Sequence, residues 1–450
     1  MSFPRYENYK DSGVEWLGDL PISWSINKIK FNTYVKGRVG WHGLNSNEFS
    51  DVGVHLVTGT DFENGFVSWD RCYRISEQRY IEDPYIQLRE NDLLITKDGT
   101  IGKLARVKGL PEQASLNSGI FLVRAKDGTY LEDFLYWILQ SSLFSHFMDL
   151  HKVGSTIQHL YQEVFNQFAF PIPSKSEQQL ICAFLDRETA KIDALIAEQQ
   201  RLIELLKEKR QAVISHAVTK GLNPNSRMKD SGIEWLGEVP EHWKIIAIKW
   251  LSPVLRGASP RPIDDPKYFD DEGEYAWVRI ADVSASDGVL RETTQKLSVL
   301  GSSLSVKIAP DELFVSIAGT VGKPCISEIK ACIHDGFVYF PRLKINPKLL
   351  YRIFESGTCY GGLGKWGTQL NLNTDTIGSI RIALPPCEEL EQVLAFLDRE
   401  TAKLDTLTKE AGQTITLLQE RRTALISAAV TGKIDVRGLV SANPEVEQAA

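Results

Sequence analysis

The chain has 450 residues, 43% of them hydrophobic, which is enough for about three domains with ordinary cores. Its formal net charge is −7, from 51 Lys and Arg against 58 Asp and Glu. No long segment is basic: the balance is −3 over residues 1–175, 0 over 176–220, 0 over 221–387 and −4 over 388–450. A uniformly basic protein is excluded, and any nucleic-acid surface must be a local patch.

Cysteine usage and the N-terminus indicate the compartment. The six cysteines are scattered without a CxxC pair, which indicates reduced thiols and no structural zinc. The N-terminus MSFPRYENYKDSG lacks the basic and apolar regions of a secretory signal. The apolar runs are shorter than the roughly 18 residues that a membrane helix needs. We therefore expect a cytoplasmic protein.

Residues 1–175 predict an α+β module with a twisted sheet. After the opening KDSGVEWLGDLPISW, short β-type runs (VHLVTG, LLIT, GIFLVRA) alternate with Gly, Asp and Asn turns. The amphipathic stretch LEDFLYWILQSSLFSHFMD predicts one or two helices. The proline-containing stretch FAFPIPSKSEQ closes the module, because proline blocks a helix until the next element begins.

Residues 176–220 predict one long helix. A capping box of Ser176 and Gln179 is expected at its start, and Gly221 lies just beyond its end. In a heptad numbering its a and d positions form a mostly apolar seam: Leu185, Ile192, Gln199, Leu206 and Val213 at d, Ile196 and Ile203 at a. Such a seam is typical of a helix that packs against a partner helix.

The remaining chain repeats this organisation. Residues 221–387 predict a second module, with the opening KDSGIEWLGEVPEHW, the runs AWVRIADV, LFVSIAG and FVYFPRL, and the closing IALPPCEEL. Residues 388–435 predict a second long helix, and residues 436–450 a disordered tail. The second seam consists of Leu397, Leu404, Ala411, Leu418 and Leu425 at d, with Leu394 and Ile415 at a.

The repeat covers the whole chain in order. The two openings are 219 residues apart, NDLLITKDGTIGK and DELFVSIAGTVGK 220, NSGIF and HDGFV 217, and the identical AFLDRETAK segments of the helices 212. Closure about a pseudo-twofold axis would bury the same seam on both helices. The helices would then run antiparallel as a coiled coil about 60 Å long, with one module at each end.

Two recurrent loops resemble phosphate-binding loops. A P-loop requires GxxxxGK followed by Ser or Thr, whereas here Lys103 precedes Leu104 and Lys323 precedes Pro324. GTIGK (99–103) and GTVGK (319–323) therefore predict tight β-turns whose Thr and Lys contact a nucleic-acid backbone. The sequence contains no HExxH, no GxGxxG and no NPP-aromatic motif. The acid clusters near Asp264 and Asp270 lack a following ExK and are typical of solvated turns, so no catalytic site is predicted.

Two similar, non-identical modules at a fixed separation suit an elongated, roughly twofold ligand. DNA fits this description, because at 3.4 Å per base pair a 60 Å ruler covers about eighteen base pairs at most. Two other classes stay open: a coiled-coil scaffold, and a nuclease or ATPase in its own right. The scaffold does not explain the paired modules, and the enzyme lacks a recognisable catalytic set.

Taken together, these motifs resemble one known family. KDSGVEWLG…PISW, KGRVGW, RGASPRPIDDPKYFDDEGEYAWVRIADV, GTIGK/GTVGK, GTQLNL, FLDRETAKID and AVTGKIDV resemble the specificity (S) subunit of type I restriction–modification enzymes, over essentially the whole chain. One departure is Gly37-Arg-Val-Gly, where the second module has Gly257-Ala-Ser-Pro, closer to the family's Gly-Thr-Pro pattern. An S-like subunit of another restriction–modification type is the alternative within this class.

The resemblance implies a fold and partners. The modules would be target-recognition domains, each reading half of a bipartite DNA site, and the helices would set the gap. The chain would be non-catalytic and bind no cofactor. Two modification subunits would bring S-adenosylmethionine, and restriction subunits would bring ATP hydrolysis, magnesium and DNA cleavage.

Candidate contact residues follow from the aligned loops and the outward helix faces. The DNA-contact candidates are Arg38, Trp41, Lys97, Thr100, Lys103, Gln158 and His159 in the first module and Arg256, Arg261, Ser316, Thr320, Lys323, Gln369 and Asn371 in the second. The candidates for contacts with the modification subunits are Arg187, Lys191, Lys207, Arg399, Lys403 and Arg421.

Overall fold

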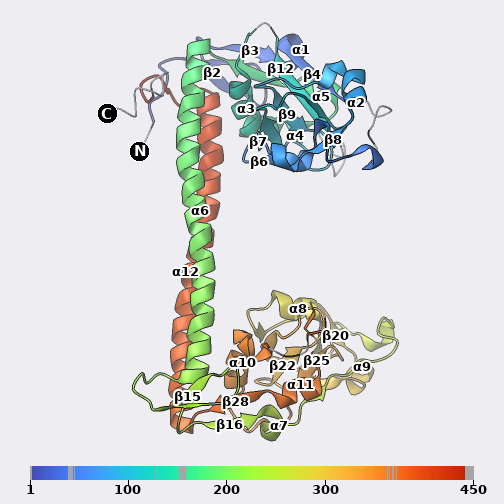
Figure 1. The fold of residues 1–450 in the computed structure, drawn as a ribbon, viewed down its shortest axis with the longest axis vertical. Coiled ribbons are helices and arrows are strands. Elements are labelled where there is room, and N and C mark those ends of the chain that lie inside the picture. The colour runs from blue at the N-terminus through green and yellow to red at the C-terminus, as the bar shows by residue number, and fades with distance from the viewer. Residues whose placement is uncertain are drawn as a thin grey trace. The chain divides into compact units, whose positions relative to one another are not determined.

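The computed structural model describes residues 3–38, 44, 46–126, 128–151, 159–361, 363, 365–366, 369–370 and 372–440. The chain forms two compact units (Figure 1): unit 1 is Met1–Gln199 with Gln413–Ala450, and unit 2 is Gln200–Gly412. Each unit contains one globular module and part of two long helices, α6 (Lys175–Lys220) and α12 (Cys387–Val430). Trp41, Gln158 and Asn371 lie outside the described residues.

In its described part, the first module is built on a six-stranded sheet. The strands, in spatial order, are β4 (Thr33–Gly37), β12 (Ile120–Ala125), β9 (Leu93–Thr96), β10 (Leu104–Arg106), β7 (Phe66–Val67) and β6 (Phe62–Glu63). A three-stranded sheet contains β11 (Ala114–Leu116), β5 (Val54–Val57) and β8 (Tyr73–Ile75). Two antiparallel pairs join β1 (Tyr9–Asp11) to β2 (Asp19–Pro21), and β3 (Ser25–Lys28) to β13 (Ala169–Ile172). The short helices are α1 (Ile29–Asn32), α2 (Glu77–Glu82), α3 (Glu132–Gln140), α4 (Ser142–Leu150) and α5 (Gln162–Phe165).

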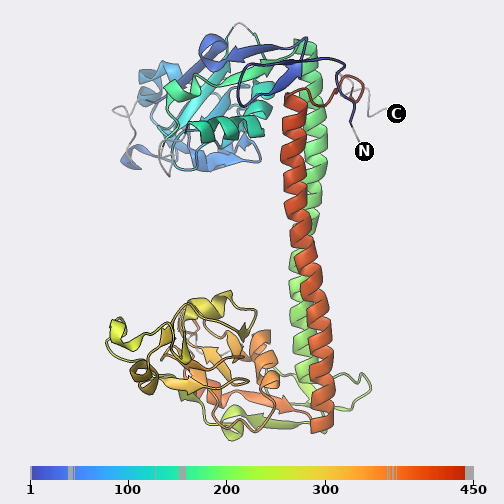
Figure 2. The ribbon, with the colours of Figure 1, turned by 180° about the vertical axis from the view of Figure 1, so that it is seen from behind.

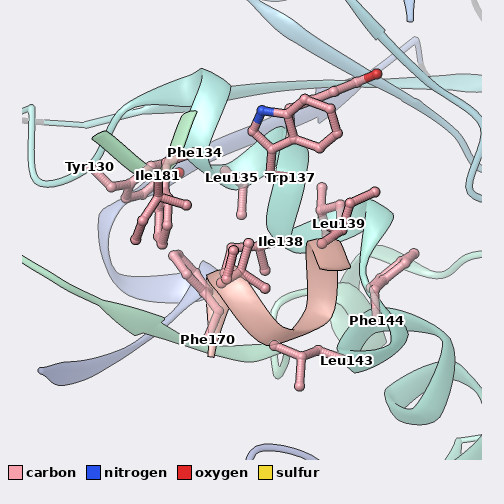
Figure 3. Packing of buried hydrophobic residues seen from close by; sticks show 14 of the residues in the cluster. Tyr130, Phe134, Leu135, Trp137, Ile138, Leu139, Leu143, Phe144, Phe170 and Ile181 are labelled. Carbon is pink, nitrogen blue, oxygen red and sulfur yellow. The ribbon is translucent and has the colours of Figure 1, made fainter. Parts of the chain in front are cut away.

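Two cores sandwich the central strand β9. Because successive side chains of a strand point to opposite faces, Leu93 and Ile95 join one cluster and Leu94 joins another. The first cluster contains the apolar face of α3 and α4, with Phe134, Ile138 and Phe144 among its members (Figure 3). The second cluster lies against the three-stranded sheet. The central sheet is therefore covered on both faces.

The second module repeats this arrangement in the part that the structure describes. Its central sheet has the order β17 (Leu255–Arg256), β25 (Phe337–Tyr339), β22 (Leu313–Ser316), β23 (Pro324–Ser327) and β19 (Val289–Leu290). A second sheet contains β20 (Lys296–Leu297), β18 (Tyr275–Val278), β24 (Ala331–Ile333) and β21 (Val306–Ile308). Three antiparallel pairs join β14 (Met228–Asp230) to β15 (Glu238–Pro240), β16 (Lys244–Ala247) to β28 (Arg381–Leu384), and β26 (Lys365–Trp366) to β27 (Gln369–Leu370).

The helices of the second module are α7 (Ile248–Leu251), α8 (Ile280–Ala285), α9 (Val299–Ser303), α10 (Pro347–Ser356) and α11 (Thr374–Ser379). Leu313 and Val315 of β22 pack with α10, whereas Phe314 joins the cluster on the other face. The two modules therefore bury alternate residues of their central strands in the same way. The predicted α+β class and the duplication are confirmed.

The two long helices run antiparallel within each unit (Figures 1 and 2). In unit 1, Ile181 and Leu185 share a core with Leu425 and Ala429, while Asp193 pairs with Arg422 nearer the other end. The predicted seam is confirmed, because the following d residues are buried: Leu185, Ile192, Leu206, Leu397, Leu404, Ala411 and Leu425. Residues at the a positions Ile196, Ile203 and Ile415 are half-buried.

The helix ends differ in detail from the prediction. Gly221 and Gly432 adopt left-handed backbones, with φ of 71° each, and end the helices as expected. At the start of α6, however, Ser174 and not Ser176 accepts the backbone N–H of Glu177, at 3.3 Å. The second helix ends at Val430 and not at 435.

The first residues of the expected disordered tail are packed. Val436 is fully buried in the core of unit 1, and Leu439 and Val440 pack against that core. The apolar character of these three side chains explains the difference. Residues 441–450 lie outside the described residues.

A repeated tryptophan marks the place where one long helix begins and the other ends. The indole N–H of Trp24 donates to Glu177 in the first turn of α6, at 3.2 Å, and Trp243 donates in the same way to Glu389 of α12, at 3.0 Å. A Cβ at Gly432 would lie 3.2 Å from Trp24, and one at Gly221 would lie 3.0 Å from Trp243. The recurrent EWLG…P…W motif is therefore a structural junction between module and helices.

Candidate nucleic-acid interface

The GTIGK and GTVGK motifs form matched hairpin turns. Each turn joins two antiparallel strands, β9 to β10 in the first module and β22 to β23 in the second. Glycine is required twice in each turn: Gly99 and Gly102 have φ of 69° and 83°. A P-loop connects a strand to a helix, so this geometry is that of the predicted tight turn and not of a nucleotide site.

A buried hydroxyl builds each turn from inside. The Thr96 hydroxyl donates to the carbonyl of Thr100 at 2.5 Å and accepts the backbone N–H of Lys103 at 2.9 Å. Ser316 makes the same two bonds, to Thr320 and Lys323. Ser316 is only 1% exposed. Its prediction as a DNA contact is therefore wrong in this structure: the hydroxyl is used by the turn.

The lysines that close the turns tie them to neighbouring segments. The ammonium of Lys103 is exposed and donates to the carbonyl of Gly59 at 3.2 Å. Lys323 is half-buried and donates to the carbonyls of Ser284 and Ser286, each at 2.9 Å. The exposed Thr320 shares a hydrogen bond with Ser284 at 2.7 Å, and Thr100 is exposed. Lys103 has more N–H groups left for a phosphate than Lys323 has, since an ammonium carries three.

The first module brings three predicted residues to one hollow of about 540 Å³. Arg38, Lys97 and His159 line it. The ammonium of Lys97 lies 5.2 Å from the centre of the Phe121 ring. His159 contacts the carboxylate of Asp98, on the turn itself, at 2.5 Å.

Arg38 is a correction to the predicted contacts. Its side chain has no solvent exposure, pairs with Asp83 and donates to the carbonyl of Leu116 at 3.0 Å. Burial lowers the pKa of its guanidinium, and the carboxylate of Asp83 opposes that effect. A buried, paired guanidinium is part of the fold, because removing either charge would leave the other unpaired.

The second module gathers two predicted arginines around Asp335. Arg261 donates to its carboxylate at 3.2 Å, and Arg256 donates to its backbone carbonyl. Ser259 donates to the other carboxylate oxygen at 3.1 Å. Burial alone would raise the pKa of Asp335, but the bond from Ser259 and the nearby arginines outweigh it and lower that pKa. Gln369 lies in β27, and its side chain is not described.

Most of the helix residues predicted to contact partners are exposed, several in ion pairs along their own helix. Lys191 pairs with Glu188, Lys207 with Glu204 and Arg399 with Glu400, and Lys403 and Arg421 are exposed. Arg187 differs, because it is half-buried and donates to the carbonyl of Leu439 at 3.3 Å.

Two interhelical ion pairs were not anticipated from the sequence. Arg210 of α6 pairs with Asp405 of α12 in unit 2, and Arg422 of α12 pairs with Asp193 of α6 in unit 1, each at 2.8 Å. Both arginines and both aspartates are 212 residues apart, which is the offset of the helix repeat. That shared offset was the available signal.

Exposed leucines on the helices repeat with the same offset. Leu195 and Leu407 are 46% and 40% exposed, and Leu205 and Leu417 are 52% and 64% exposed. Exposed single leucines are ordinary, but these recur at equivalent positions of both repeats. They form the apolar part of the outward helix faces.

Two further searches bear on function. In the ranges that the structure describes, no three His, Cys, Asp or Glu side chains are grouped so that they could hold a metal ion. No helix in those ranges is long and apolar enough to cross a bilayer.

Comparison with known proteins identifies the family. The model of the type I restriction modification DNA specificity domain matches residues 43–205 and 240–417. The putative type I restriction enzyme MjaX specificity subunit of Methanocaldococcus jannaschii is 23% identical, over 97% of this chain and 99% of that protein. The EcoKI specificity subunit of Escherichia coli is 20% identical, over 93% and 90%.

Solved structures show the same fold. A chain from a structural study of the assembly and conformational transition of the type I R-M system has a TM-score of 0.68, at 17% identity over 92% of this chain and 99% of that one. The HsdS subunit from Thermoanaerobacter tengcongensis has a TM-score of 0.52, at 16% identity over 92% and 98%. The chain therefore belongs to the type I restriction–modification DNA specificity family, as a specificity subunit and not as an enzyme.

Proposed function

We propose that each module reads one half of a bipartite DNA site and that the two long helices fix the gap between the halves. The observation that carries this proposal is the matched pair of turns, each built on a buried hydroxyl and closed by a lysine, in modules whose surrounding charged residues differ. Shared turns suit the DNA backbone, which is the same everywhere, and divergent neighbours suit two different base sequences. Mapping of methylated bases tests the proposal.

The partners follow from the same function. Two modification subunits would dock on the outward helix faces, because Leu195 and Leu417 in unit 1 recur as Leu407 and Leu205 in unit 2. The exposed charges of Lys191, Lys207, Arg399, Lys403 and Arg421 would form the rim of these contacts. S-adenosylmethionine is expected on the modification subunits, and ATP and magnesium on the restriction subunits. All six cysteines are free thiols, which fits a cytoplasmic location.

Replacing Lys103 by alanine is expected to weaken DNA binding of the methyltransferase complex equally for all sequences. Lys103 is exposed on the turn, and loss of one phosphate contact lowers the slope of log affinity against log salt by about 0.9. The control is Lys126→Ala, an exposed lysine just beyond the opposite end of β12. An unchanged salt slope in Lys103→Ala would remove this residue from the interface.

The chain alone is expected to bind specific duplex at least about tenfold more weakly than it does with its modification subunit. Phosphate neutralisation dominates protein–DNA affinity, and the net charge of −7 limits how many phosphates this chain can neutralise. The measurement is a titration at fixed salt with and without the modification subunit. Equal affinity in both titrations would contradict the expectation.

A further inference from the structure

Asp335 lies at the edge of the second module that carries the GTVGK turn. It occupies the loop between β24 and β25, next to Gly336, whose carbonyl accepts the backbone N–H of Ile317 at 2.8 Å. Ile317 is the first residue after β22, where the turn begins. The carboxylate of Asp335 and the turn therefore belong to one surface.

Three side chains of one segment converge on this residue. Arg256, Ser259 and Arg261 follow β17, and all three bond to Asp335: Ser259 and Arg261 to its two carboxylate oxygens, Arg256 to its backbone carbonyl. The arginines place two positive charges beside one negative charge. The group is a local basic patch in a segment, residues 221–387, whose charges otherwise balance.

The ion pair does little for stability. The side chain of Arg261 is 70% exposed and that of Asp335 is 43% exposed, and exposed pairs contribute about 0–1 kcal/mol. What the pair does is restrict a long, flexible side chain to one orientation before any ligand binds. Arg261 has five N–H groups and donates one of them to Asp335. Its planar fork is thus oriented at the turn surface.

We propose that Arg261 reads a guanine in the half-site recognised by the second module, and that Asp335 and Ser259 are its positioning residues. This inference rests on the proposed function. Guanine presents two acceptors, O6 and N7, in the major groove, and an arginine fork donates to both at once. A guanine contact therefore uses the donors that Asp335 leaves available.

The first module has a different arrangement at the same place. Ser118 stands where Asp335 stands in the repeat, and Asp98 on the turn takes the place of Ala318. The cation that faces this acid is His159, at 2.5 Å. The acid and its cationic partner have thus moved to other segments, which gives the two modules different reading chemistry on similar turns.

The test is methylation mapping with complexes that contain the modification subunits and either the wild-type chain or one of three variants. Arg261→Ala is expected to relax one guanine position of the second half-site by about 10- to 100-fold, the range for a bidentate contact. Asp335→Asn is expected to relax the same position less, with the first half-site unchanged. The control is Arg291→Ala, which breaks a similar exposed pair, with Asp287 at 3.0 Å, and should leave the motif unchanged.

Three outcomes would overturn the inference. A uniform loss of affinity with a smaller salt slope in Arg261→Ala would make it a phosphate contact. An unchanged motif in that variant would remove it from the interface, and an unchanged guanine preference in Asp335→Asn would remove the positioning role. Thermal unfolding like that of the wild type, together with Arg261→Lys, which keeps the charge without the fork, separates these outcomes from misfolding. If the wild-type complex itself methylates no gapped site, the proposed function fails instead.

Discussion

Deleting one heptad from each long helix is expected to end methylation at sites with the native gap. Residues 198–204 of α6 and 411–417 of α12 are suitable, because removal of whole heptads keeps the seam in register. Seven helical residues span about 10 Å, which corresponds to about three base pairs of DNA. Sites that are still methylated should keep both half-site sequences and show a shorter gap.

The matched control replaces the same two heptads by others of equal length with the same a and d residues. The gap should then be unchanged. Methylation mapping of both variants provides the measurement. A double-deletion variant that methylates the native gap as well as the control does would show that the helices do not set the spacing.

Replacing Arg210 by glutamate is expected to lower the free energy of unfolding of unit 2 by about 3–5 kcal/mol, as for other broken, partly buried pairs. Arg210 bonds to Glu355 of α10 at 2.9 Å as well as to Asp405 of α12. Its side chain is 23% exposed and that of Glu355 is 14% exposed. The variant would place three carboxylates together and loosen both α12 and the module from α6.

The control for this variant is Lys207→Glu, one turn earlier on the same helix. Lys207 is 61% exposed and pairs with Glu204 on its own helix, so the same charge reversal should have little effect. Urea unfolding and hydrogen exchange of residues 347–356 measure the difference. Equal stability of the two variants would contradict the role given to Arg210.

The repeated pair in unit 1 allows a charge swap. Arg422→Asp alone should destabilise the helix pair, and Asp193→Arg added to it should restore most of the loss, because the remaining partner of Arg422 is the neutral Gln140. A double-mutant cycle isolates this interaction from the other effects of each substitution. Additive losses in the double variant would show that the pair does not fix the alignment of the helices.

The helices, the duplication and the turns were predictable from the sequence, because each depends on local pattern. The heptad seam of Leu185 and Leu397, the identical AFLDRETAK segments and the glycines of the turns are signals within short stretches. The structure has all three. The end of α12 at Val430 and the packed Val436 were missed, because tertiary contacts decide where the last turn stops.

The direction of individual side chains was not predictable. Arg38 is buried because Asp83, 45 residues away, faces it, and Ser316 is buried because the turn folds over it. A motif marks such residues as special but does not tell a structural hydroxyl or guanidinium from one that contacts a ligand. The role of Asp335 depends in the same way on residues 74 to 79 positions earlier in the chain.

The central claim is that two modules read two half-sites across a fixed gap. The most direct test expresses this chain with its modification subunits in a host that lacks other methylation and maps methylated adenines across the genome. The account predicts one bipartite motif with two specified halves and a gap of constant length. A continuous motif without a gap, or a gap of variable length, would contradict it.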